Sequence, residues 1–154
     1  MENYLLVAVD TSQTATDVLA YAIKLAKLDQ LRIRLISVVH STSNPYNISV
    51  TANDIITRNV TMNGEINESN HSLIDNTKRY LTQLVTEQGL AETDVDIQVL
   101  QGNTKQQLVQ SASEADVQQV VMGALGTHSL TGNLLGSVTD YVIRQSSKTV
   151  TVVK

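Results

Sequence analysis

Short apolar runs that alternate with stretches of helical periodicity are the feature that most constrains how this chain can fold. The first run, 4–9, is continuously apolar and only a strand long, which is typical of a strand buried on both faces of a parallel sheet. Further strands are expected at 32–39, 95–99, 120–122 and 149–153.

Between these runs, apolar residues recur at the spacing of one helix face. The expected helices lie at about 18–26, 66–85, 105–114 and 137–145. Ser12 or Thr14 can cap the first of them. Right-handed crossovers turn this βαβαβαβαβ order into one parallel sheet with helices on both faces, so the predicted fold class is α/β. Segment 40–63, rich in Ser, Thr and Asn, lacks the periodicity and predicts a long loop with room for one helical turn.

Composition narrows the class of protein. A chain of 154 residues predicts a single domain, 1–154, and 42% hydrophobic with 17% charged residues indicates a globular protein. The absence of Cys excludes a disulfide scaffold and a thiolate metal site. No apolar run is long enough to span a membrane and the start of the chain lacks a basic leader, so a cytoplasmic location is expected. The net charge of −4, without a basic cluster, argues against nucleic acid as a partner.

The loop after the fourth strand is the candidate ligand site, because ligands of open α/β sheets bind beyond the carboxyl ends of the strands. Gly123 and Gly126 allow a sharp turn and close approach of a ligand to the backbone. Gly136 and Ser137 open a helix, whose free N–H groups favour an anion. The same residues also fit a plain strand-to-loop turn and an ordinary helix cap, so spacing alone leaves both interpretations open.

The spacing G-x2-G-x9-G-[ST], met at Gly123, Gly126, Gly136 and Ser137, resembles the ATP-binding signature of the universal stress protein family. The similarity extends to 5–12, 121–123, 136–144 and 149–153. The resemblance implies an adenine nucleotide alpha-hydrolase-like fold with strand order 3-2-1-4-5. It also implies a homodimer joined through the last strand, 149–153.

The resemblance implies that a bound ATP is held mostly by backbone groups. Asp10 would hydrogen-bond the adenine or ribose region, Gly123 would lie against the ribose, and Ala8 and Val38 would offer backbone groups to the nucleoside. The phosphates, balanced by Mg²⁺, would contact Gly126, Gly136, Ser137 and Val138. The remaining expected cofactor-binding positions are Val9, Met122, Thr127 and His128.

Two of these residues have a simpler alternative role. An acid such as Asp10 at the end of a parallel strand also commonly caps the next turn. His128 equally fits a solvated loop histidine beside the phosphates. His40 and His71 have no spacing that suggests a metal site, and no nucleophilic triad is readable, so no catalytic residue and no metal ligand is expected.

The chain departs from the family pattern at three places. Ala8 stands where many members have Pro, and Gln118 stands where an Asp is usual. The stretch 127–135 contains no Arg or Lys, although many members carry one there. Phosphate binding would then depend on backbone donors, hydroxyl groups such as those of Ser129 and Thr131, and the metal.

The leading functional hypothesis is an ATP-binding, nucleotide-dependent regulatory protein of the stress response. A slow ATPase or self-phosphorylating enzyme using the same pocket is the first alternative, and it ranks lower because no base or arginine finger is apparent. A structural dimer that no longer binds nucleotide is the second alternative.

Overall fold

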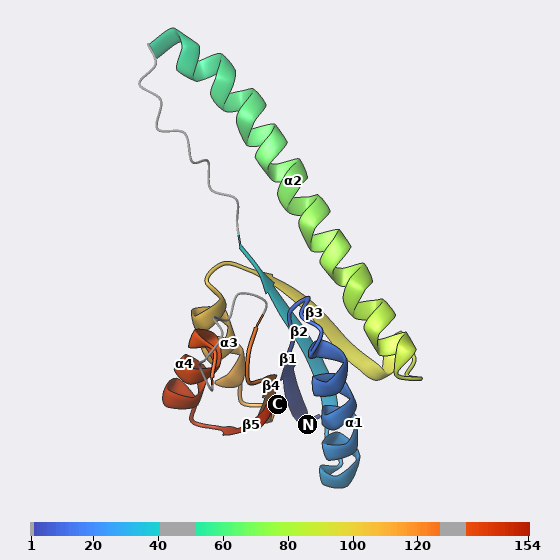
Figure 1. Cartoon of the computed structure of the whole chain (residues 1–154). Helices are drawn as coiled ribbons and strands as arrows, with labels where there is room; N and C mark the ends of the chain where they lie inside the picture. Colours follow the sequence, from blue (N-terminus) through green and yellow to red (C-terminus); the bar gives the residue numbers. More distant parts are fainter. Residues whose placement is uncertain (1, 41–51, 127–134) are drawn as a thin grey trace.

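The computed structural model describes residues 2–40, 52–126 and 135–154. Its strands form one five-stranded, all-parallel sheet in the order β3-β2-β1-β4-β5 (Figure 1). The strands are β1 (Tyr4–Ala8), β2 (Arg32–Val39), β3 (Val95–Gln101), β4 (Val117–Gly123) and β5 (Thr149–Val153). The α/β class and the strand order are therefore confirmed.

Helices cover both faces of the sheet, as expected. They are α1 (Ala15–Asp29), α2 (Ala52–Glu87), α3 (Thr104–Ala112) and α4 (Ser137–Gln145), with a short 3-10 turn, η1 (Glu92–Asp94), before β3. Buried side chains of α1 and α2 share one hydrophobic cluster, whereas those of α3 and α4 belong to another. The result is three layers with the sheet in the middle.

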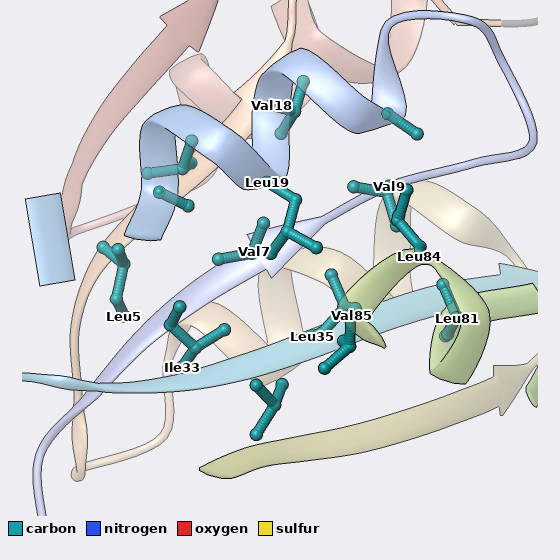
Figure 2. Close-up of a cluster of buried hydrophobic side chains, with 14 of the residues drawn as sticks. Leu5, Val7, Val9, Val18, Leu19, Ile33, Leu35, Leu81, Leu84 and Val85 are labelled. Carbon is teal, nitrogen blue, oxygen red and sulfur yellow. The ribbon is translucent and has the colours of Figure 1, made fainter. Parts of the chain in front are cut away.

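The central strand β1 explains why the sheet needs two helical layers. All five of its residues are buried, and their side chains alternate between the two clusters. Leu5 and Val7 meet α1 and the end of α2, where Leu84 and Val85 pack (Figure 2). Leu6 faces the α3 and α4 side. The continuous apolar run of this strand is thus the signature of burial on both faces.

Helix α2 corrects the loop predicted for 40–63. The helix begins at Ala52 and runs for 36 residues, about 54 Å at the usual rise, and its first half extends past the sheet (Figure 1). The prediction was wrong from 52 onward because Asn and Thr lower helix propensity by only a fraction of a kcal/mol each and do not end a helix as Pro does. Segment 41–51 lies outside the described residues.

A buried arginine ties three segments together at the amino end of the sheet. Arg34 on β2 is 7% exposed and its guanidinium lies 4.0 Å from the centre of the Tyr4 ring. It donates to Asp96 on β3 at 2.7 Å, and to Glu114 and Asp116 before β4 at 2.7 and 3.0 Å. Hydrogen bonds from Arg34 lower the pKa of the Asp116 carboxyl below its ordinary value. A buried cation with this many carboxylate partners strongly favours one register of β2, β3 and β4.

Replacing this arginine should destabilise the fold in a pH-dependent way. Arg34→Met should lower the free energy of unfolding by about 3 kcal/mol at pH 7, because the carboxylates lose their buried partner. The stabilisation linked to Asp116 is fully present above its unfolded pKa of about 3.9 and is lost as the pH falls through the lower folded value. Urea unfolding at pH 7 and below pH 4 measures the free energy of unfolding of both proteins. The difference between wild type and variant should be smaller below pH 4.

Arg32→Met is the matched control, because it removes the same charge from the same strand. The Arg32 and Glu2 side chains are 42% and 60% exposed, so their ion pair should contribute little to the free energy of unfolding. An equal loss of unfolding free energy in the two variants would contradict a special role for Arg34. So would a difference between wild type and Arg34→Met that does not change with pH.

Candidate functional site

A cavity of about 770 Å³ opens at the carboxyl edge of the sheet. It lies over the ends of β1, β2 and β4, where the strand order turns back on itself. Every predicted site residue that the structure describes lines it: Ala8, Val9, Asp10, Val38, Met122, Gly123, Gly126, Gly136, Ser137 and Val138. Thr127 and His128 lie outside the described residues.

The walls of the cavity come from both helical layers. Ile36 and Leu108 reach it from the α3 and α4 side, and Val18 and Leu73 from the α1 and α2 side. Polar residues lie between the apolar ones: Thr11, Ser12 and Ser137 also line the cavity. A largely apolar cavity of several hundred Å³ with a few polar groups is typical of a small-molecule site.

Asp10 lies two residues after the end of β1 and takes part in the turn that leads to α1. Its Oδ1 accepts a hydrogen bond from the Ser12 backbone N–H at 2.9 Å. The side chain of Thr14, at the N-cap position of α1, makes no capping bond and instead lies 2.9 Å from the Ser12 hydroxyl. The predicted cap by Ser12 or Thr14 was therefore wrong, because the two hydroxyls bond each other and the Asp10 carboxylate accepts the Ser12 N–H instead.

The other carboxylate oxygen of Asp10 lies close to Gly126. A Cβ built on Gly126 would lie 2.9 Å from Asp10 Oδ2, closer than real side chains come. The glycine thus lets the loop after β4 lie directly against the end of β1. Asp10 thus contacts both the turn before α1, through Oδ1, and the loop after β4, through Oδ2.

The two ends of the loop after β4 are fixed by hydrogen bonds. The Ala124 N–H donates to Val153 O at 2.8 Å, and the Gly136 N–H donates to Ala124 O at 2.7 Å. The buried Thr139 hydroxyl donates to Gly123 O at 2.8 Å, which joins the first turn of α4 to β4. These bonds bring Gly123 and Gly136 together although thirteen positions separate them in the sequence.

The amino end of α4 is suited to an anion. Gly136 is its N-cap residue and has no side chain to occupy the first-turn N–H groups. The amino ends of α1 and α3 also reach the cavity, through Thr14 and Thr104, and each helix end carries a partial positive charge. The described lining residues include one carboxylate, Asp10, and no lysine or arginine.

Sequence reasoning missed the wall that α2 contributes. Leu73 and Thr77 line the cavity, whereas their spacing predicts only that they belong to a helix at about 66–85. One helical turn further along, Tyr80 donates a 3.4 Å hydrogen bond to the Asp10 backbone carbonyl, and burial raises the pKa of its hydroxyl, with the nearby Asp10 charge adding to the effect. No sequence signal separates a helix position facing a ligand from one facing the core, because both are apolar and equally spaced.

Two other site types are not found in the described part of the chain. No group of three or more potential metal-ligating side chains occurs there. Among the described helices, none has the length and apolar character needed to cross a bilayer.

The fold occurs in solved structures, among them proteins described as universal stress proteins. The protein MJ0577, described as hypothetical, is 25% identical, with a TM-score of 0.75 and coverage of 100% of this chain and 96% of that one. The universal stress protein UspA from Lactobacillus plantarum is 20% identical, with a TM-score of 0.68 and coverage of 99% and 97%. A universal stress protein from Archaeoglobus fulgidus, solved in complex with dAMP, is 20% identical, with a TM-score of 0.60 and coverage of 100% and 98%.

The family assignment comes from the sequence as a whole. No curated protein matches the chain. Residues 3–154, nearly its full length, match the universal stress protein family. The chain therefore belongs to the universal stress protein family.

Proposed function

We propose that this protein binds an adenine nucleotide, ATP together with Mg²⁺, in the cavity at the carboxyl edge of the sheet. The observation that carries the proposal is the uncapped amino end of α4, held by backbone bonds beside Gly123 and facing an apolar cavity. A phosphate chain suits the amino end of α4, and a purine suits the apolar cavity. The dAMP complex of the Archaeoglobus fulgidus protein supports this class of ligand.

Each part of the nucleotide has a suitable wall. The phosphates would lie against Gly126 and the first turn of α4, where N–H groups are available. The ribose would lie over Gly123 within reach of Asp10, and the base would occupy the space beside Val38 and Leu73. Mg²⁺ would be held by the phosphates themselves.

We further propose that the protein acts as a nucleotide-dependent regulator in the stress response. A ligand that binds only the folded state stabilises it, and Asp10 and α2 offer a route for this effect. The Tyr80 hydroxyl donates a hydrogen bond to the Asp10 backbone. A nucleotide bound at Asp10 would therefore also stabilise the part of α2 that packs on the sheet.

The protein is also proposed to form a homodimer through β5. This strand, Thr149–Val153, ends the sheet and contains only Thr and Val, so its outer edge suits pairing with a second copy.

Titration calorimetry with ATP and Mg²⁺ tests the nucleotide proposal. The wild type should bind with micromolar affinity, and the double variant Gly126→Val, Gly136→Asp should not bind measurably. Valine at 126 meets the Asp10 carboxylate. Aspartate at 136 caps α4 well but places a negative charge where the phosphates would lie.

Asn3→Asp is the matched control, because it adds the same charge at the opposite, amino end of the sheet. The new carboxylate can still accept the hydrogen bond that Gln118 donates to Asn3. This variant should bind ATP like the wild type. A folded wild type that gives no heat with ATP, ADP or AMP would refute the proposed function.

Variants of Asp10 should separate its two roles. Asp10→Asn keeps an oxygen for the Ser12 N–H, so its melting temperature should stay close to the wild type. Its ATP affinity should fall about tenfold, because a hydrogen bond to an ionised group is lost. Asp10→Ala should lose both affinity and about 1 kcal/mol of stability. Unchanged affinity in Asp10→Asn would leave Asp10 as a turn residue alone.

Sedimentation equilibrium tests the dimer. The expected mass is about twice the 16.8 kDa of one chain, with or without ATP. A monomer mass at every protein concentration up to the millimolar range would contradict pairing through β5.

A further inference from the structure

A triphosphate brings more negative charge than the described cavity walls offset. The walls provide helix amino ends but no lysine or arginine, and Asp10 adds a negative charge of its own. The stretch 127–135 contains no Lys or Arg in the sequence either. His40 is the one basic side chain among the described lining residues, so a lysine or arginine that meets the phosphates must come from outside the lining.

Lys105 on the first turn of α3 is in the right place. Its neighbour Thr104 lines the cavity, and the Lys105 ammonium group lies 5.6 Å from the centre of the Tyr141 ring on α4. Tyr141 follows Ser137 by four residues, so both lie on one face of α4 and are one helical turn apart. The charge of Lys105 therefore lies beside α4 at Tyr141, whose backbone is one helical turn from Ser137, and Lys105 itself is not among the residues that line the cavity.

The contact with Tyr141 is one that a phosphate can replace. Lys105 and Tyr141 are both partly exposed to solvent, and a cation–π contact there is weak. A charge-assisted hydrogen bond to a phosphate oxygen is stronger, and the flexible stem of a lysine allows the amine to move by one turn. Ligand binding would therefore draw the amine from the ring to the phosphates.

We propose that Lys105 contacts the β- or γ-phosphate of the bound nucleotide and makes the site selective for di- and triphosphates over monophosphates. This inference rests on the proposed nucleotide site and adds to it the residue that distinguishes phosphate-chain length. A monophosphate bound at Gly123 and the α4 amino end has no group that extends to Lys105.

Calorimetric titration of ATP, ADP and AMP, each with Mg²⁺, tests the selectivity. Lys105→Met should weaken ATP and ADP binding about tenfold and leave AMP within about twofold, as expected for one lost charge-assisted contact. Lys105→Arg should retain most of the preference for ATP over AMP. The dependence of ATP affinity on salt concentration should also become less steep in Lys105→Met.

Lys24→Met is the matched control, because it removes the same charge from an exposed position on α1. It should change none of the three affinities. An equal loss for ATP and AMP in Lys105→Met, or no loss at all, would overturn the role of Lys105 while leaving the nucleotide site intact. A folded wild type that binds none of the three ligands would overturn both proposals.

Discussion

The burial of β1 on both faces is the constraint on which the rest of this structure depends. A strand with no exposed side chain needs a helical layer above and below, and parallel pairing on both sides needs long crossovers. The chain leaves β1 toward β2 along one face and returns to β4 after crossing the other. The cavity is a consequence of this reversal, because the connections diverge and leave the carboxyl ends of β1 and β4 uncovered.

The two ends of the sheet have opposite electrostatic character. At the amino end, three carboxylates surround the buried Arg34 and link β2 to β3 and to the segment before β4. At the carboxyl end, three helix amino termini face the cavity and Asp10 is the only carboxylate among its described lining residues. At one end carboxylates surround a cation, and at the other the helix amino termini suit an anionic ligand.

Much of this architecture is predictable from the sequence, and the reasons differ by element. Strand β2, helix α4 and strand β5 match their expected bounds because short apolar runs and glycine boundaries are local signals. The strand order was implied by family resemblance and not by the residues, because nothing local specifies which strands pair. The start of α2 was missed because a polar helix and a polar loop have similar composition.

The candidate site shows the same division. The glycine spacing predicts the loop after β4, because close approach of a backbone leaves a mark on the sequence, as Gly126 against Asp10 shows. Leu73 on α2 and Lys105 on α3 carry no such mark. Their place depends on how two helices dock on the sheet, which is a tertiary effect that residue spacing does not report.

The two outer strands differ in a way that bears on how copies of this chain can join. Strand β5 has an uncharged outer edge, whereas β3 carries Asp96 and is packed by α2 and η1. Contact between β5 of one copy and β3 of the next would repeat without end and build a fibre. Contact between the β5 edges of two copies leaves neither β5 edge open for a third copy. The proposed pairing of β5 with β5 would therefore close on itself and would not grow into a fibre.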